Sequence, residues 1–423
     1  MSPAGLFLVQ VLILIAVPFV IWSIPFVRHT VPLVVIQILF GIALGPTLLA
    51  RIAPVFASLV LPASSLERLS GISWLAVMFF TFLTGLHLDV GELAGKGRAF
   101  FATGVSSMLT PLVFGAGVGL WAISHLRGLM GPNATETTFV LAIGLCVSAT
   151  ALPVLGAILR ETGLIRWPLG RLAIGYAALN DFMLWILIIA LLTMIGASSN
   201  RVGNFIAMIL STLLYVGFMV FCARPLLTTL FDKASVGING LGDSRIVLIS
   251  AVVLASGLAT EVLGLHYLIG AFVAGLVMPN SAKQSIMAHF EPVTVFVLLP
   301  VYFILTGLKV TLDLRSGDVL CFFVIATLAA VGGKILGTAV PARLAGHDWR
   351  EAIQLGALMQ CKGLVEVVIL TVLLDAGLIS NSAFSALILM ALVTTALTMP
   401  VARAMGASGA NFECRTDADS FVS

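Results

Sequence analysis

Charged residues are scarce in this sequence. Asp, Glu, Lys and Arg make up 10% of its 423 residues, hydrophobic residues make up 60%, and the mean hydropathy is +1.14. A soluble domain is about one-quarter charged, so this composition excludes a soluble globular protein. The apolar residues form continuous runs rather than the alternating pattern of a transmembrane β-barrel. We therefore expect an all-α polytopic membrane protein.

Several functional signals are also missing. The sequence has no basic tract, which argues against a nucleic-acid partner, and its five cysteines show no paired spacing that would hold a metal. It has no Gly-x-x-x-x-Gly-Lys-Ser/Thr loop, so ATP-driven pumping is not expected, and neither is a cofactor. The apolar stretch 1–25 lacks a basic start and a small-residue cleavage site. It predicts a first membrane helix rather than a signal peptide.

The apolar runs predict about 13 transmembrane helices joined by short linkers. Their ranges are 5–26, 31–50, 70–88, 99–124, 137–160, 169–197, 203–230, 244–262, 264–279, 292–308, 318–341, 351–376 and 382–404. We expect residues 1–404 to form a single membrane transport domain. Residues 405–423 are polar, and we expect them to form a short, disordered cytoplasmic tail.

The loop charges predict the orientation in the membrane. Lys and Arg concentrate in cytoplasmic loops, and an odd number of spans places the two termini on opposite sides. With a cytoplasmic C-terminus, the inner side carries 14 Lys and Arg residues and the outer side six. The N-terminus is therefore expected outside. Short loops and the lack of a targeting extension favour the inner membrane of a bacterium.

A carboxylate lies near the middle of the sixth expected span. Asn180 and Asp181 interrupt an otherwise apolar stretch from Leu172 to Leu191. An ionisable side chain at bilayer depth costs roughly 3 kcal/mol, so it typically faces a water-filled cavity or binds something. Asp181 is a candidate site for either a proton or a cation, the alternative being a structural residue paired to a lysine. Asn180 cannot titrate and is expected to orient a neighbour or stabilise the helix pair.

Lys334 lies inside the eleventh expected span, next to glycines at 332, 333 and 337. Small residues let a second helix approach closely, and a lysine at such a contact is a natural partner for Asn180 and Asp181. The alternative is that its long side chain reaches the membrane interface. Its position well inside the span favours the first interpretation.

Two spans carry polar residues in their middle. Residues 359–366 read Met-Gln-Cys-Lys-Gly-Leu-Val-Glu, and residues 148–153 read Ser-Ala-Thr-Ala-Leu-Pro, whose proline disrupts the helical hydrogen bonding. Interrupted spans in corresponding halves of a chain indicate a transporter built from inverted repeats, with helix ends at the membrane midplane.

Each interruption supplies candidate site residues. Lys362 would compensate carbonyl ends of the broken helices, and Glu366 would compensate amide ends or line a funnel to one side of the membrane. Ser148 and Thr150 are candidate ion-binding residues. The alternative for both is a hydroxyl that bonds back to its own helix.

These features favour a secondary active antiporter that exchanges Na⁺ or K⁺ for H⁺ by alternating access around Asp181. Competition for one carboxylate would couple the two fluxes. A proton-coupled transporter of an organic solute is the alternative, with Asp181 as the proton site only. A cation channel would be expected to show an acidic ring, and an enzyme would need a metal cluster or an activated nucleophile. The sequence shows neither pattern.

Ordered motifs run along nearly the whole chain, from about residue 10 to residue 400. They are Gly-Ile-Ala-Leu-Gly-Pro at 41–46, Phe-Leu-Thr-Gly-Leu-His-Leu-Asp at 82–89, Ser-Ala-Thr-Ala-Leu-Pro-Val-Leu at 148–155, Gly-Arg-Leu-Ala at 170–173, Asn-Asp at 180–181, Gly-Ala-Phe-Val-Ala-Gly-Leu-Val-Met-Pro at 270–279, Gly-Lys-Ile-Leu-Gly-Thr at 333–338 and Lys-Gly-Leu-Val-Glu at 362–366. This set resembles the monovalent cation:proton antiporter superfamily, and most closely its branch of Kef-type potassium efflux systems and plant cation/proton exchangers.

The resemblance implies an inverted-repeat fold of two bundles. The ion-carrying core, around 137–197 and 318–376, would hold two crossing broken helices, and the remainder would form a scaffold and dimerisation surface. A homodimer and an elevator-like motion are also implied.

The same resemblance implies roles for individual residues. Asp181 would bind the cation and the proton, Thr150 and nearby carbonyl groups would complete the coordination, and Lys334 would reach toward Asn180 and Asp181. Electrogenic relatives tend to have two adjacent acids, so Asn180 favours electroneutral exchange. The nucleotide-binding regulatory domain of full Kef systems is not expected within this chain.

Overall fold

The computed structural model describes residues 2–53, 62–87, 97–126, 128–162, 164, 167–198, 210–211, 213–232, 243–263, 267–311 and 317–420. Within these ranges the chain is built of helices, with an isolated antiparallel bridge between Met130 and Ile379. The expected all-α fold is confirmed. Asp89, the start of the seventh expected span and the start of the ninth at 264–266 lie outside the described residues.

The chain divides into two compact units. Unit 1 comprises Met1–Pro18, Gln37–Ala94 and Trp185–Lys309, and unit 2 comprises Phe19–Ile36, Gly95–Leu184 and Val310–Ser423. Each unit therefore combines segments that are far apart in the sequence. Unit 2 contains the segments 137–184 and 318–376, which hold all the expected site residues.

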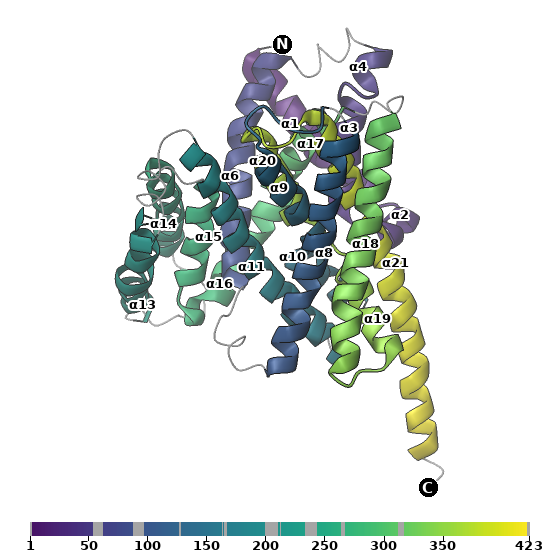
Figure 1. Cartoon of the computed structure of the whole chain (residues 1–423). Helices are drawn as coiled ribbons and strands as arrows, with labels where there is room; N and C mark the ends of the chain where they lie inside the picture. The colour runs from purple at the N-terminus through teal and green to yellow at the C-terminus, as the bar shows by residue number, and fades with distance from the viewer. Residues whose placement is uncertain are drawn as a thin grey trace. The chain divides into compact units, whose positions relative to one another are not determined.

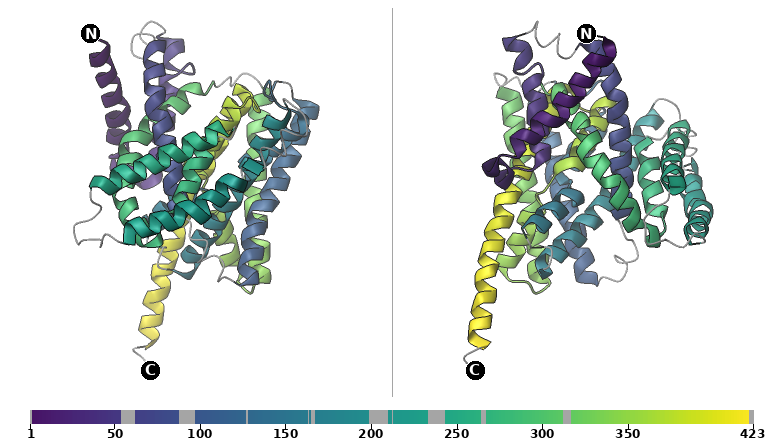
Figure 2. Two further views of the ribbon diagram at one scale, coloured as in Figure 1. Left: turned by 90° about the vertical axis from the view of Figure 1, so that its left-hand side faces the viewer. Right: turned by 180° about the vertical axis from the view of Figure 1, so that it is seen from behind.

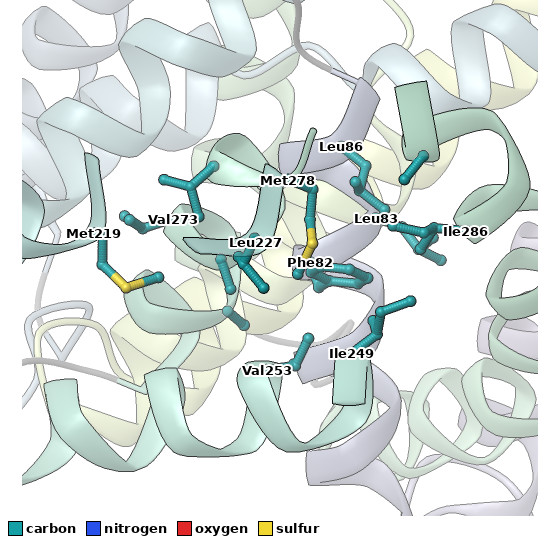
Figure 3. Packing of buried hydrophobic residues seen from close by; sticks show 14 of the residues in the cluster. Phe82, Leu83, Leu86, Met219, Leu227, Ile249, Val253, Val273, Met278 and Ile286 are labelled. Carbon is teal, nitrogen blue, oxygen red and sulfur yellow. The ribbon is translucent and has the colours of Figure 1, made fainter. Parts of the chain in front are cut away.

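Unit 1 is a bundle of apolar helices. It contains most of α1 (Pro3–Trp22) and α3 (Leu33–Leu44), then α4 (Leu49–Ile52), α6 (Ala63–His87), the end of α11 (Pro168–Ser198), η2 (Met219–Ala223), α13 (Arg224–Asp232), α14 (Asp243–Val262), α15 (Tyr267–Val277), α16 (Asn280–Val293), η3 (Thr294–Leu298) and α17 (Leu299–Lys309). Figure 3 shows its core, where Phe82 and Leu86 of α6 lie among apolar side chains that include Ile249 of α14 and Val273 of α15.

Unit 2 contains the two interrupted helix pairs. Its elements are α2 (Pro25–Thr30), the start of α3, α8 (Arg98–His125), α9 (Glu136–Ser148), α10 (Leu152–Glu161), the start of α11, α18 (Gly317–Leu344), α19 (Trp349–Leu358), α20 (Gly363–Asp375) and α21 (Asn381–Ser420). Helix α8 packs along both α9 and α18 (Figure 1).

Close packing of α8 against α18 depends on glycine. A Cβ atom on Gly333 would lie 2.6 Å from Cα of Pro111, and one on Gly337 would lie 2.6 Å from the carbonyl oxygen of Ser106. Among the described residues, nothing lies within 4 Å of the corresponding position on Gly332. The sequence therefore predicts the close approach correctly at 333 and 337, whereas Gly332 takes no part in it because it lies on another side of α18.

Nine helices in the described part of the chain are long and apolar enough to cross a membrane, and α3, α9 and α15 are shorter apolar helices. The expected spans at 137–160 and 351–376 are each interrupted, as predicted, since α9 ends at Ser148 before α10 begins, and α19 ends at Leu358 before α20 begins.

Two span ends differ from those expected. The tenth span was expected to start at 292, but a continuous helical run begins at Asn280 with α16. It widens into the π-helical turn η3 at Thr294–Leu298, between prolines at 292 and 300, which each remove a backbone donor.

The last helix, α21, continues to Ser420, where we expected a disordered tail from residue 405 (Figures 1 and 2). No proline follows Pro400 in this stretch, and the alanines at 402, 404, 407 and 410 favour a helix.

Candidate functional site

The two interrupted helix pairs of unit 2 meet at their breaks. The backbone N–H of Ala151 donates to the carbonyl oxygen of Cys361 at 2.8 Å, and the Thr150 hydroxyl donates to the carbonyl oxygen of Met359 at 3.1 Å. Non-helical backbone is tolerated inside a membrane protein only where its polar groups find partners. Each break therefore supplies hydrogen-bonding partners to the other.

Lys362 holds the carbonyl end of α9. Its ammonium group is fully buried and donates to the carbonyl oxygens of Cys146 and Val147, each at 2.8 Å, and of Ala149 at 3.3 Å. The last carbonyl groups of a helix have no partner within the helix and carry partial negative charge. A lysine at this position satisfies both their hydrogen bonding and their charge, which is the placement that the sequence predicted.

Glu366 lies in the first turn of α20, near its amide end. Its Oε2 lies 3.4 Å from Nζ of Lys362, one turn earlier on the helix, and the side chain is fully buried. Neither carboxylate oxygen meets a hydrogen-bond donor among the described residues. Glu366 therefore places its negative charge at the amide end of α20, which is one of the two roles expected from the sequence. It also balances the charge of Lys362, and its burial excludes a place on an open funnel.

A neutral hydroxyl caps the amide end of α20. Thr395 of α21 accepts hydrogen bonds at Oγ1 from the backbone N–H groups of Lys362, at 3.3 Å, and of Gly363, at 3.0 Å. Gly363 has a φ of +55°, in the left-handed region that favours glycine. Nothing in the sequence singles out Thr395, because threonine is common in apolar helices.

Asp181 lies on α11 beside the first break. It is fully buried, and both of its carboxylate oxygens lack a hydrogen-bond partner in the described structure. The backbone amide of Leu152, at the start of α10, approaches the carboxylate without completing a hydrogen bond. An orphaned buried carboxylate is costly, and its oxygen atoms are the ligands that alkali and other hard cations prefer.

Asn180 connects three neighbours next to Asp181. Its amide oxygen faces the ammonium group of Lys334 at 3.1 Å and the hydroxyl of Ser107 at 3.1 Å, and its amide nitrogen donates to the carbonyl oxygen of Gly104 at 2.9 Å. The amide is assigned in this orientation because the opposite one would turn its nitrogen toward Lys334.

Lys334 is held on the Asn180 side of the pair. Its fully buried ammonium group donates to the carbonyl oxygen of Ser107 at 3.0 Å as well as facing Asn180, and it makes no hydrogen bond to Asp181. The lysine thus reaches the Asn180–Asp181 pair from α18, as predicted, and does not extend to a membrane interface. The charges of Asp181, Glu366 and Lys362, which are also fully buried, nevertheless act on Lys334.

The two candidate hydroxyls behave differently. Ser148 bonds back to the carbonyl oxygen of Leu145 in its own helix at 3.0 Å, which is the alternative considered from the sequence. Thr150 instead bonds across to Met359, and its oxygen keeps free lone pairs. Of the two, Thr150 is the one that joins the contact between the breaks.

A family model described as sodium/hydrogen exchanger, transmembrane, matches residues 11–403. The chain belongs to this family. The match covers both interrupted helix pairs and the positions of Asp181, Lys334 and Lys362, so the site described above lies wholly within the family's shared region.

Curated relatives have similar sequences over most of the chain. Cation/H(+) antiporter 15 of Arabidopsis thaliana is 32% identical over 88% of this chain and 44% of its own length. K(+)/H(+) antiporter 1 of Saccharomyces cerevisiae is 32% identical over 95% of this chain and 46% of its own length. The chain spans about half the length of these relatives. Na(+)/H(+) antiporter NhaS4 of Synechocystis is 32% identical over 89% of this chain and 91% of its own length.

A solved structure shows the same fold. The sodium proton antiporter MjNhaP1 of Methanocaldococcus jannaschii superimposes with a TM-score of 0.63, covering 96% of this chain and 98% of its own. The sequences are 13% identical, so the likeness concerns the fold alone. The inverted-repeat fold expected from the broken spans agrees with it.

Proposed function

We propose that this chain is a secondary active antiporter that exchanges Na⁺ or K⁺ for H⁺, one for one, at Asp181. The observation that carries the proposal is the state of the Asp181 carboxylate. It is buried at a helix break, and its two oxygens have no hydrogen-bond donor among the described residues. A carboxylate left in this state is stabilised by a bound cation or by a proton, and it cannot hold both at once.

The surroundings of Asp181 fit this exchange. The Thr150 oxygen and the carbonyl groups at the breaks are neutral oxygen ligands of the kind that complete the coordination of an alkali cation. Asn180 adds no second titratable group, so one cycle would move one cation against one proton. The binding site would face the two sides of the membrane alternately, and the proton gradient would drive the exchange.

The relatives support the reaction class. Their names describe cation/H⁺, K⁺/H⁺ and Na⁺/H⁺ antiporters, which agrees with a shared mechanism that accepts different alkali cations. We propose either Na⁺ or K⁺ as the transported ion. We also propose that the chain acts as a homodimer without a cofactor, in the inner membrane of a bacterium, with its N-terminus outside.

Transport in proteoliposomes tests the proposal. Vesicles with an imposed pH gradient and an internal pH dye would receive Na⁺, K⁺, Li⁺ or choline in turn, with wild type, Asp181→Asn and Asp318→Asn. Asp318 is an exposed acid in the first turn of α18, so it provides a matched control. We expect a cation-specific pH signal in wild type and Asp318→Asn, and no such signal in Asp181→Asn.

Two results would contradict the proposal. Equal signals from wild type and Asp181→Asn would remove Asp181 from the exchange site. If folded wild type gave no signal with any alkali cation, a proton-coupled organic-solute transporter would become the better interpretation.

A further inference from the structure

The carbonyl group that accepts from Lys334 has lost its usual partner. In an α-helix each backbone N–H donates to the carbonyl oxygen four residues earlier, so the donor for Ser107 would be residue 111. That residue is proline, inside the continuous helix α8, and proline has no N–H. The ammonium group of Lys334 donates to this carbonyl oxygen at 3.0 Å.

The same short stretch of α8 also fixes Asn180. The Ser107 hydroxyl lies 3.1 Å from the amide oxygen of Asn180, and the carbonyl oxygen of Gly104 accepts from the amide nitrogen at 2.9 Å. Ser107 therefore contacts Lys334 through its backbone and Asn180 through its side chain, and it is itself fully buried.

Pro111 contributes a second feature to this arrangement. Gly333, next to Lys334 in the chain, packs so tightly on Pro111 that a Cβ atom there would lie 2.6 Å from the proline Cα. Pro111, which leaves the Ser107 carbonyl without a backbone donor, is thus also the residue against which α18 packs. This contact places the backbone of Lys334 close enough for its side chain to reach that carbonyl.

We propose that Ser107 and Pro111 are positioning residues that dock Lys334 beside Asn180 and thereby keep its ammonium group from pairing with Asp181. The inference rests on the proposed exchange at Asp181. We call Ser107 and Pro111 together the dock. While Lys334 is held at the dock, both Asp181 oxygens stay open to the transported cation. A backbone N–H that shares the Ser107 carbonyl oxygen weakens the contact with Lys334. A weakened or missing contact makes Lys334 an internal competitor for the Asp181 carboxylate, because the charge of Asp181 acts on Lys334.

The first test restores the missing donor. Pro111→Ala supplies an N–H for the Ser107 carbonyl and needs less space than proline. We expect the KM for the transported cation to rise about tenfold, a factor equivalent to about 1.4 kcal/mol, with kcat little changed. Pro400→Ala is the control, because Pro400 is also inside a helix of unit 2 but is exposed and lies outside the dock; its KM should match wild type.

The second test asks whether the effect passes through the lysine. Pro111→Ala would be combined with Lys334→Met, and cation binding would be read from the rise in Tm that added Na⁺ or K⁺ produces. In the Lys334→Met background we expect Pro111→Ala to cause no further loss of cation-induced stabilisation. An equal loss in both backgrounds would show a structural effect of the proline alone and overturn the proposal.

The outcomes distinguish a failure of the docking proposal from a failure of the proposed function. Absence of exchange in folded wild type contradicts the proposed function, whereas exchange in wild type with an unchanged KM in Pro111→Ala overturns only the dock. If Pro111→Ala does not fold, Ser107→Ala takes its place, since it removes the hydroxyl that holds Asn180. We then expect a higher KM that depends on Lys334, and a change independent of Lys334 would count against the dock.

Discussion

Nζ of Lys362 and Oε2 of Glu366 lie 3.4 Å apart, one helical turn from each other, and both side chains are fully buried. The lysine also serves three carbonyl oxygens at the end of α9, whereas the glutamate has no hydrogen-bond donor among the residues that the structure describes. Removing the Lys362 side chain would therefore leave more buried polar groups without a partner than removing the Glu366 carboxylate.

This inequality predicts different costs for removing each charge. Lys362→Met leaves a buried carboxylate and three carbonyl groups unpaired, and we expect a loss of about 3–5 kcal/mol in the free energy of unfolding. Glu366→Gln leaves the lysine on its three carbonyl groups, so the loss should be smaller. Thermal unfolding of the purified variants in one detergent would measure both. Equal losses would show that the carbonyl contacts contribute little.

A second prediction concerns coupling to the membrane potential. The Asn180 amide oxygen lies 3.1 Å from the Lys334 ammonium group. Asn180→Asp would put a carboxylate oxygen in its place and would add a second titratable group to the site. We expect cation/proton exchange in this variant to respond to an imposed membrane potential. Wild type should not respond, because its loading and unloading involve Asp181 alone.

Proteoliposomes with a valinomycin-clamped potassium potential would test this, using Na⁺ as the transported ion. Asn180→Ser is a suitable control, since it removes the amide without adding a charge. A wild-type rate that depends on potential as steeply as that of Asn180→Asp would contradict the one-for-one exchange.

Neighbouring glycines in α18 allow a matched test of helix packing. Gly333→Ala should destabilise the protein by about 1–3 kcal/mol, the usual cost of overpacking, because its Cβ would collide with the backbone of Pro111. Gly332→Ala, one residue away, meets nothing within 4 Å in the described part of the chain and should be neutral or slightly stabilising, since alanine favours a helix. Unfolding of the two variants under identical conditions decides the matter, and similar stabilities would refute the packing.

The cap on α20 can be tested at Thr395. Thr395→Val keeps the shape of the side chain but removes the acceptor for the Lys362 and Gly363 amides, which should cost about 1–3 kcal/mol of stability because two buried donors lose their partner. Thr395→Ser retains the hydroxyl and should lose much less. If valine and serine were equally tolerated, water or another group would have to satisfy the α20 amides.

Polarity within apolar runs was enough to find most of the site from the sequence. Asp181, Lys334 and Lys362 stand out because each is a rare charge in a long apolar stretch, and the structure brings them into one buried cluster. The interrupted spans were also visible, since Pro153 and the polar stretch 359–366 both disfavour a continuous membrane helix. These signals are strong because a membrane penalises exposed polar groups heavily.

Residues that act through common, neutral groups do not stand out in the sequence as rare charges do. Thr395 and Ser107 look like ordinary hydroxyl residues of apolar helices, and their roles depend on which helix faces them. Ser107 did have an indirect signature, a proline four residues later that frees its carbonyl. Glu366 is different, because it is charged and is already a candidate from the sequence, where its i, i+4 spacing from Lys362 is that of a helical ion pair.

The contacts between the two breaks also bear on how the protein is made. Lys362 reaches the carbonyl oxygen of Cys146 across 216 residues of sequence, and Thr150 reaches Met359 across 209. During synthesis, the first interrupted helix pair must therefore enter the bilayer before its partner exists, with its polar ends unsatisfied. Assembly of the ion site becomes a late event, and ribosomes that stall before Lys362 would leave a membrane-inserted intermediate that is open to quality-control proteases.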